Sequence, residues 1–280
     1  MLQSLQDKVV LNNGVEMPWF GLGVFKVQEG SEVIDSVKFA IKHGYRSIDT
    51  AAVYRNEEGV GQAIAEAIRD YSVSREELFI TSKVWNGDQG YDTALAAFDL
   101  TMQKLGLEYL DLYLVHWPVK GKYKDTWRAL EEIYASGRVR AIGVSNFHVH
   151  HLEDLLADAK IVPAVDQIEF HPYLSQPELR EYAPKKGIRL EAWSPLAQGK
   201  ILHDPVLGEI AAKHGKTPAQ IILRWDVQLG VVTIPKSVQE NRIIENASIF
   251  DFELSDEDMQ TISALNKNER VGSDPDNFNF

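Results

Sequence analysis

Short hydrophobic runs alternate with segments of helical periodicity along most of the chain. Several of the runs are almost continuously apolar, which is typical of parallel strands buried on both faces. Their first residues recur every 23 to 32 residues, before a last interval of 43. We interpret eight runs as strands: residues 20–24, 46–50, 78–84, 110–116, 139–145, 164–170, 187–193 and 230–236.

The segments between these runs carry apolar residues at helical spacing. Residues 57–69 and 91–105 each present one apolar face. Residues 217–229 add the signals of a helix start, because Thr217 can serve as the N-cap and Pro218 fits the first helical position. Two further helical patterns follow the last strand, at residues 239–247 and 256–266.

Eight strand–helix units predict an α/β fold, a (β/α)8 TIM barrel, with residues 1–280 in a single domain. The alternative is a doubly wound open sheet. The count of eight favours the barrel, and neither GLGVFK from Gly21 nor GVGQAI from Gly59 has the third glycine of a dinucleotide fingerprint. Before the first strand, Asn12-Asn13-Gly14 between two apolar runs predicts a β-hairpin, which we expect to cap the bottom of the barrel.

Composition narrows the classes of function. The 280 residues carry 29 Lys+Arg against 41 Asp+Glu, and the net charge of −12 argues against binding to nucleic acid or to an anionic membrane surface. The absence of cysteine removes disulfides, thiolate catalysis and thiolate metal sites. We see no signal peptide and no apolar run approaching about 18 residues, so we expect a cytoplasmic protein.

Charged residues stand at the ends of otherwise apolar strands, where barrel enzymes carry their active sites. Asp49 and Lys83 end the second and third strands, and their pairing fits either a structural ion pair or a functional site. We expect the lysine to lower the pKa of a nearby tyrosine such as Tyr54 and make it a general acid. His116 ends the fourth strand, where it is either a hydrogen-bonded core histidine or a donor to a carbonyl oxygen. Convergence of all four on one face of the barrel favours catalysis.

These residues lie in long motifs of a known family. Asp49 and Tyr54 lie in DTAAVY, Lys83 in ITSKVW and His116 in YLVHWP. The motifs GVSNF at 143–147, DQIEFHP at 166–172 and IPKSVQENRIIEN at 234–246 follow in order. From Gly14 to Leu265 the chain resembles the aldo-keto reductases. It is most similar to the short bacterial members that reduce glyoxal, methylglyoxal or diketo-sugar acids such as diketogluconate.

The resemblance implies that Asp49, Tyr54, Lys83 and His116 form a catalytic tetrad. Hydride would pass from NADPH to the carbonyl carbon of a small aldehyde or ketone. Tyr54 would donate the proton, Lys83 and Asp49 would tune it, and His116 would orient the carbonyl group. Some relatives carry Glu in place of the tetrad histidine and reduce conjugated C=C bonds, so His116 implies carbonyl reduction. The family also implies a monomer.

The same resemblance assigns a cofactor site. Ser145, Asn146 and Gln167 match positions that hydrogen-bond the nicotinamide amide, and Trp193 matches the ring that stacks on it. Lys236 and Arg242 match the positions that bind the 2′-phosphate, so NADPH is the predicted cofactor. The predicted cofactor contacts are Gly23, Val24, Asp49, Ser145, Asn146, Gln167, Trp193, Ser194, Leu196, Ile234, Lys236, Ser237, Val238, Arg242, Glu245 and Asn246.

Aromatic residues beside the strand ends predict an apolar rim for small carbonyl substrates. For Phe25, packing at the barrel rim is an equally good interpretation. Phe278 and Phe280 lie in a polar tail that either covers the barrel mouth or is disordered. The predicted substrate contacts are Trp19, Phe25, Tyr54, Trp85, His116 and Trp117.

Two clusters invite other interpretations. His148, His150 and His151 suggest a metal site, but they have no neighbouring Cys and lie at a helix start, so we expect a solvated face and no metal. Glu57-Glu58 suggests a carboxylate pair, but adjacent residues do not converge on a helix, so we expect a helix N-terminal charge effect.

Two other functions compete with a reductase. Some proteins that resemble the family act as cofactor-sensing subunits of channels, which would require slow turnover and a partner surface. A metal-dependent isomerase on the same barrel would require a cluster of carboxylates at the strand ends, where only Asp49 is clearly placed. The intact tetrad favours the reductase.

Overall fold

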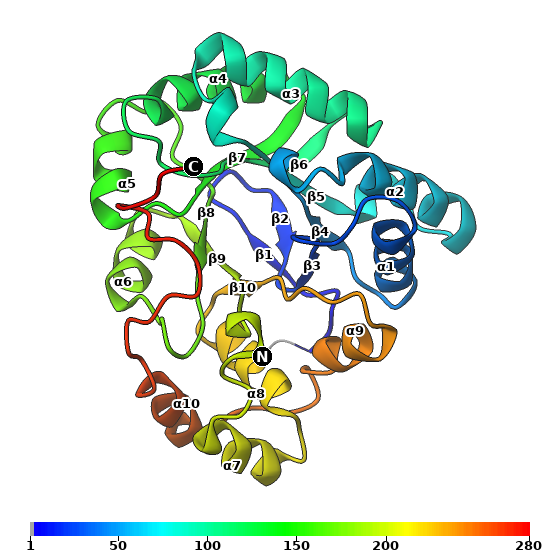
Figure 1. Cartoon of the computed structure of the whole chain (residues 1–280), viewed down its shortest axis with the longest axis vertical. Helices are drawn as coiled ribbons and strands as arrows, with labels where there is room; N and C mark the ends of the chain where they lie inside the picture. The colour runs from blue at the N-terminus through cyan, green and yellow to red at the C-terminus, as the bar shows by residue number, and fades with distance from the viewer. Residues whose placement is uncertain (1–2) are drawn as a thin grey trace.

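Eight parallel strands surround a central axis, with helices outside them (Figure 1). The structure is a computed structural model that describes residues 3–280. The strands follow one another around the sheet in chain order, which a doubly wound sheet would not do. Their bounds are β3 (Gly21–Gly23), β4 (Ser47–Asp49), β5 (Phe79–Val84), β6 (Leu110–Val115), β7 (Val139–Ser145), β8 (Val165–Glu169), β9 (Arg189–Trp193) and β10 (Val232–Thr233).

The barrel closes between its last and first strands through a narrow seam. Phe20 and Thr233 form an isolated parallel bridge, and the Gly23 backbone N–H donates to the Pro235 carbonyl oxygen at 3.3 Å. The predicted (β/α)8 barrel is therefore confirmed. The predicted strand 230–236 is reduced to Val232–Thr233, because the chain turns into a loop at Pro235, which has no N–H to donate to a sheet.

Helices cover the outside of the barrel, and several begin and end where the sequence predicts. The helix predicted for residues 91–105 is confirmed in full, and the capping box of Thr217 with Gln220 begins another. The pattern at 256–266 gives a helix that ends earlier, at Ser263. The bounds are α1 (Ser31–Lys42), α2 (Glu57–Tyr71), α3 (Tyr91–Leu105), α4 (Tyr123–Ala135), α5 (Val149–Leu156), α6 (Pro177–Lys185), α7 (Pro205–His214), α8 (Pro218–Gln228), α9 (Glu240–Ala247) and α10 (Asp256–Ser263), with short 3-10 turns η1 (Ala52–Tyr54), η2 (Arg75–Glu77), η3 (Asn86–Asp88) and η4 (Ala197–Gly199).

An N-terminal hairpin plugs one end of the barrel. Strands β1 (Lys8–Val10) and β2 (Glu16–Pro18) pair antiparallel on either side of the predicted Asn-Gly turn. Met17 is fully buried against Phe79 and Val165, which begin β5 and β8. The amino ends of the strands are thus closed, and the carboxyl ends are left for a site.

Trp19 lies at this closed end, so its prediction as a substrate contact is wrong. It packs against the hairpin cluster, and the guanidinium of Arg189, the first residue of β9, lies 5.3 Å from the centre of its ring. The reason is its place in the chain: Trp19 precedes β3 and therefore lies at the amino end of that strand.

Among the described residues, no helix is long and apolar enough to cross a membrane.

Candidate active site

The predicted tetrad comes together at the carboxyl ends of β4, β5 and β6. Asp49 ends β4, Lys83 lies one residue before the end of β5, and His116 follows β6 directly. Tyr54 arrives on η1, the single turn after β4. The Lys83 Nζ atom lies 2.7 Å from Asp49 Oδ1 and 3.4 Å from the Tyr54 hydroxyl, and the rings of Tyr54 and His116 are 5.9 Å apart.

Lys83 is a fully buried cation with three oxygen partners. Its Nζ donates to Asp49 Oδ1, to the Thr50 carbonyl oxygen at 2.9 Å, and to the Tyr54 hydroxyl. Burial is the largest single influence and lowers the pKa of Lys83, but the charge and hydrogen bond of Asp49, together with Tyr54 and Glu191, outweigh it and hold this pKa above its ordinary value. The lysine is therefore charged at neutral pH.

Tyr54 does not have the lowered pKa that the sequence predicts. Burial of the phenol raises its pKa above the ordinary value, and the opposing effect of the Lys83 charge is smaller. The correction follows from the surroundings: the sequence predicts the cation but not how completely the phenol is buried, with the Phe25 ring packed against it. Tyr54 is therefore a protonated donor at neutral pH.

His116 is a neutral imidazole. Burial and the nearby charge of Lys83 both lower the pKa of His116, well below its usual value. Within residues 3–280 its buried Nδ1 has no hydrogen-bond partner. Aromatic packing holds the ring instead: the His116 and Trp85 rings lie edge to face, with 5.2 Å between their centres. A neutral ring can donate one hydrogen bond to a carbonyl oxygen without adding charge.

A second buried carboxyl, Glu191 of β9, lies below the tetrad, and sequence reasoning missed it. The Gln167 Nε2 atom donates both to Asp49 Oδ2 and to Glu191 Oε2, each at 2.8 Å. Burial and repulsion from Asp49 raise the pKa of Glu191 to about 8. The available signal was a lone acidic residue in the apolar run GIRLEAW.

Known proteins are similar to this chain over nearly its whole length. The model of the aldo/keto reductase family matches residues 20–267. The chain belongs to the aldo/keto reductase family. It is 67% identical over 280 residues to a glyoxal reductase of Bacillus subtilis (strain 168), with all of both chains covered. It is 46% identical over 272 residues to methylglyoxal reductase DkgA of Salmonella typhimurium, covering 96% of each chain.

Solved aldo-keto reductase structures agree with the fold and include complexes. A mutant of Gox0644 in complex with NADPH matches with a TM-score of 0.92 at 45% identity, covering 98% of this chain and 99% of that one. An aldo-keto reductase of Bombyx mori in complex with NADP matches with a TM-score of 0.91 at 37% identity, covering 99% and 97%.

In this aldo-keto reductase, the predicted nicotinamide contacts form one hydrogen-bonded group at the ends of β7, β8 and β9. The Asn146 Nδ2 atom donates to the His116 carbonyl oxygen and to Ser145 Oγ, and Ser145 Oγ donates to the Gln167 carbonyl oxygen. The Trp193 indole N–H donates to Asn146 Oδ1 at 2.9 Å. The donors of the three polar side chains are thereby used, so the group offers mainly acceptor oxygens to a ligand amide.

Two of these strand-end residues have unusual backbone. Asn146 and Ser194 have positive φ of 66° and 47°, a conformation that costs energy for residues other than glycine. They directly follow β7 and β9. Such strain at the carboxyl ends of strands is a mark of a functional site.

The predicted phosphate contacts lie around the start of α9. Lys236 and Arg242 are exposed, and neither has an ion pair among the described residues. Ser237 is buried and accepts from the Gln239 N–H. Glu245, another predicted cofactor contact, accepts from Thr217 Oγ1 at 2.9 Å. Unpaired cations at a helix N-terminus fit a phosphate group. The other predicted contacts lie at the end of β3, in the loops after β3, β9 and β10 and on α9: Gly23, Val24, Leu196, Ile234, Val238 and Asn246.

The remaining aromatic residues gather at the mouth of the barrel. Phe25 lies 5.0 Å from the ring of Tyr54, and Trp85 lies beside His116. The C-terminal segment covers this mouth. The Phe280 ring stacks on Trp85 with 5.7 Å between ring centres, and the centres of the Phe278 and Phe280 rings each lie 5.2 Å from that of Trp117.

The two remaining clusters differ from their predictions. Glu57 begins α2 but is buried, and it accepts from Ser82 Oγ at 2.7 Å, so its role is local packing as well as a helix-end charge. Of the histidines, only His150 is exposed, and His148 and His151 are partly buried against Asp276.

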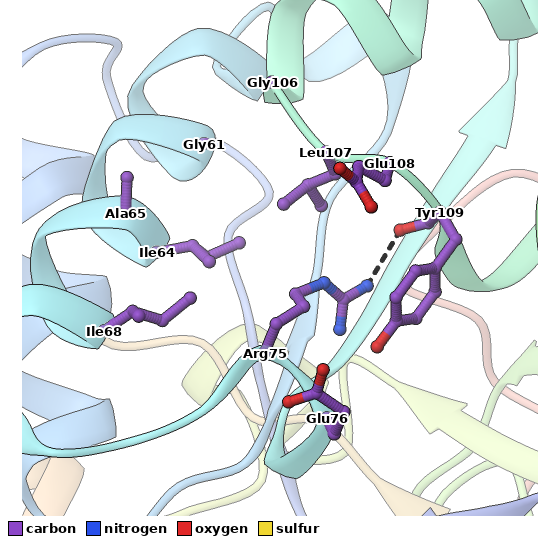
Figure 2. A pocket seen from close by; sticks show the side chains of 10 residues that line it. All are labelled: Gly61, Ile64, Ala65, Ile68, Arg75, Glu76, Gly106, Leu107, Glu108 and Tyr109. Carbon is purple, nitrogen blue, oxygen red and sulfur yellow. Dashed lines mark hydrogen bonds between the residues drawn. The ribbon is translucent and has the colours of Figure 1, made fainter.

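A separate hollow of about 280 Å³ opens between α2 and the loops that precede β5 and β6 (Figure 2). Arg75 extends into it and donates to the Leu78 and Tyr109 carbonyl oxygens. No tetrad residue lines the hollow, which lies at the amino ends of the strands. It is not the reductase site.

Proposed function

We propose that this aldo-keto reductase reduces small dicarbonyls of the glyoxal and methylglyoxal type, with Tyr54 as the general acid. The observation that carries the proposal is the placement of the protonated Tyr54 hydroxyl 3.4 Å from a buried ammonium group, beside a neutral imidazole. Its two relatives named for glyoxal and methylglyoxal reduction support the substrate class.

NADPH is the cofactor, and the residues present fit it. Acceptor oxygens of Ser145 and Gln167 suit the N–H groups of a carboxamide, because the two N–H bonds of the Gln167 amide are already taken by Asp49 and Glu191. Lys236 and Arg242 suit a phosphate dianion. When bound, NADPH supplies the hydride that reduces the carbonyl carbon.

Side chains of the protein then supply the proton and stabilise the charge that its transfer leaves behind. As the carbonyl carbon gains hydride, its oxygen becomes an alkoxide and takes the proton of the Tyr54 hydroxyl. The phenolate left behind is stabilised by the Lys83 ammonium, which Asp49 keeps charged. The neutral His116 ring donates a hydrogen bond that holds the carbonyl oxygen near Tyr54. Trp85 and Phe280 limit the access of water to this point.

Turnover assays with a Tyr54→Phe variant test the assignment. Oxidation of NADPH would be followed with glyoxal, methylglyoxal, a diketo-sugar acid and an aromatic aldehyde, with NADH in parallel. We expect the dicarbonyls to be reduced with NADPH, and kcat to fall roughly 10²–10⁴-fold in the variant. NADPH binding by fluorescence should be unchanged.

Three results would contradict the proposal. Near-normal turnover by Tyr54→Phe would remove the tyrosine from its role. Preference for the diketo-sugar acid would move the substrate class to keto-sugar acids. Tight NADPH binding without reduction of any carbonyl would favour a cofactor-sensing subunit.

The phosphate assignment has its own test. Replacing Arg242 with Ala should weaken NADPH binding about 10- to 100-fold, since a hydrogen bond to a charged group contributes about 1.5–3 kcal/mol, and leave NADH binding unchanged. Arg128→Ala on α4 is the matched control, because that arginine makes surface contacts with Asp125 and the Tyr91 ring, away from the predicted cofactor site. Equal losses for NADPH and NADH would contradict the assignment.

We also propose that residues 1–280 act as one domain and as a monomer, as the resemblance implies. Light scattering after size exclusion should give one monomeric species. A dimer of stable mass would overturn this.

A further inference from the structure

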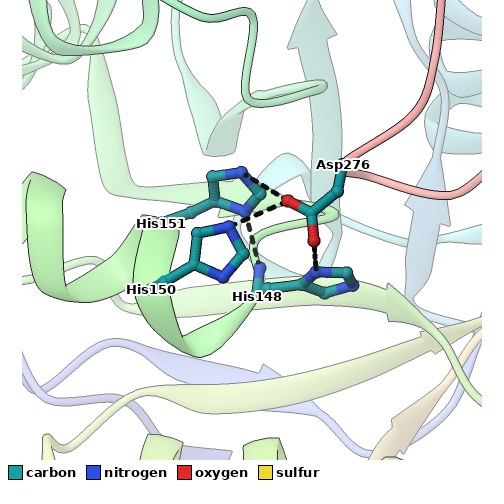
Figure 3. Close-up of side chains that lie close together, drawn as sticks. All are labelled: His148, His150, His151 and Asp276. Carbon is teal, nitrogen blue, oxygen red and sulfur yellow. Dashed lines mark hydrogen bonds and ion pairs between the residues drawn. The ribbon is translucent and has the colours of Figure 1, made fainter.

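Three histidines and one carboxylate converge where the C-terminal segment crosses the start of α5 (Figure 3). His148 Nδ1 lies 3.0 Å from Asp276 Oδ2. His150 Nε2 and His151 Nε2 lie 2.8 and 3.3 Å from Asp276 Oδ1. All four ligand atoms lie within 4.8 Å of one another. Asp276 is the partner that sequence reasoning missed, because it lies far along the chain in the tail.

We propose that His148, His150 and Asp276 bind a divalent transition-metal ion of the Zn²⁺ type, and that the ion fastens the C-terminal segment to α5. Imidazole nitrogen and carboxylate oxygen are ligands that zinc takes in proteins, and three protein ligands leave a position for water. The binding itself does not depend on the proposed function.

The distances leave room for an ion after a small adjustment. Bonds of about 2.0 Å in a tetrahedron place ligand atoms about 3.3 Å apart. The observed N···O separations of 2.8 to 3.0 Å between Asp276 and the two proposed histidine ligands are those of hydrogen bonds. These two N···O separations must therefore lengthen by a few tenths of an ångström, and Asp276 belongs to a surface segment that can shift.

The hydrogen bonds of the histidines decide which of them bind. A metal on one ring nitrogen leaves the proton on the other. For His148 that other atom, Nε2, now accepts from the Arg270 guanidinium at 2.9 Å, so Arg270 must turn toward solvent. The cap of α5 is reciprocal, since the His148 and His151 rings each accept from the other's backbone N–H. For His151 the accepting atom is Nδ1, which must carry the proton if Nε2 binds the ion, so binding by His151 would break that half of the cap. The second ring nitrogen of His150 accepts no such hydrogen bond from the described residues. His151 therefore lies beside the ion but does not bind it.

An ion can reach this site from solvent. The cluster borders an open hollow of about 610 Å³, which the side chains of Glu153, Glu178 and Arg270 also line. Two carboxylates against one guanidinium attract a cation once Arg270 has turned away. The entry path meets the requirement for an exchangeable metal site.

The ion would add an anchor to the segment over the mouth. Existing anchors include Glu169 at the end of β8, whose carboxylate accepts from the Val271 and Gly272 N–H groups at 2.6 and 3.0 Å, and Asn86, whose Nδ2 atom donates to the Phe280 carbonyl oxygen at 3.1 Å. Asp276 lies two residues before Phe278, which packs on Trp117. Fixing Asp276 therefore holds the aromatic cover in place.

Titration of tag-free protein with Zn²⁺ alone, by calorimetry in a non-chelating buffer, tests the binding. We expect one site per chain, weakened at least about tenfold in Asp276→Asn and in His150→Asn. His203→Asn, an exposed histidine outside the cluster, should match the wild type. His151→Asn should bind within a few-fold of the wild type. Binding that is absent, or equal in Asp276→Asn and wild type, would overturn the site, and a tenfold loss in His151→Asn would overturn the ligand assignment.

A spin label tests whether the ion fastens the segment. Because the chain has no cysteine, Asn277→Cys accepts a single nitroxide beside Asp276. Zn²⁺ is diamagnetic and should broaden the spectrum only by slowing the label, with reversal by a chelator. The same label in a His150→Asn background should not respond. Binding by calorimetry without slowing of the label would overturn the anchoring role.

Discussion

The two ends of this barrel are closed in opposite ways. At the amino ends of the strands, the β1–β2 hairpin inserts apolar side chains, with Met17 fully buried and Val9 and Leu11 nearly so. At the carboxyl ends, the C-terminal segment is tied by Glu169 and by the cluster around Asp276, and its Phe280 ring remains 50% exposed. The plug is apolar and dry, whereas the cover is held by polar contacts, of which those to Asp276 lie at the surface and can be released.

The two kinds of closure fit the different roles of the two ends, stability at the amino ends of the strands and substrate access at their carboxyl ends. Apolar burial stabilises the barrel without directional demands, so it can be placed where no ligand enters. The mouth must admit a substrate and then exclude water, and polar anchors at its edge allow both. Variants at the two ends should therefore separate stability from catalysis.

The largest expected effect is on the plug. Met17→Ala should lower the free energy of unfolding by about 2–5 kcal/mol, because it removes a fully buried side chain and leaves a cavity. Urea denaturation measures this, and the KM for a dicarbonyl should not change. Val10→Ala, on the neighbouring strand and 62% exposed, is the control and should cost less than about 0.5 kcal/mol. Equal losses in the two variants would break the comparison.

The next largest effect is the pH dependence of the free energy of unfolding that comes from Glu191, the buried carboxyl below the mouth. The pKa of Glu191 is about 8 in the folded protein and about 4.3 in an unfolded chain. Between these values the folded state holds a proton that the unfolded state has lost, so the free energy of unfolding falls as pH rises through this window. Glu191→Gln should lessen this fall by at least about 1 kcal/mol.

Denaturation curves of wild type and Glu191→Gln from pH 5 to about pH 8 check this sign. Glu181→Gln, an exposed glutamate on α6, is the control and should run parallel to the wild type. If the free energy of unfolding of Glu191→Gln falls with pH as steeply as that of the wild type, this carboxyl is already ionised in the folded protein.

The smallest effect is expected at the cover. Phe278→Ala should change the KM for small dicarbonyls by a few-fold and lower the free energy of unfolding by less than about 1 kcal/mol, because the ring is only partly buried. Leu100→Ala, at a 50% exposed apolar side chain on α3 outside the mouth, should change neither. A stability loss as large as that of Met17→Ala would show that the cover is a second plug.

Local patterns were enough to predict most of the fold and the tetrad. The apolar stripe at residues 91–105 gives α3 because its period needs no tertiary information. Asp49, Lys83 and His116 were found because charge is rare at the ends of buried strands, and parallel strands bring such ends together.

Quantities that depend on the packed environment were not predictable from the sequence. The direction of the Tyr54 pKa follows from burial by residues of other strands. From its position beside a predicted strand, Trp19 was assigned to the rim of the mouth, but the direction of β3 places it at the closed end. Asp276 and His148 meet only through the path of the tail, which no periodicity encodes.

The seam between β10 and β3 has a consequence for how the chain holds its ring shape. β10 has two residues, and the closure depends on one bridge and one backbone bond across it. A Cβ on Gly23 would lie 3.0 Å from the Ile234 carbonyl oxygen, so the two proposed cofactor-contacting loops touch across this joint. Joining such distant segments costs loop-closure entropy. A ligand that binds both loops offsets that cost, so we expect NADPH, through the proposed contacts in the two loops, to stabilise the closed ring.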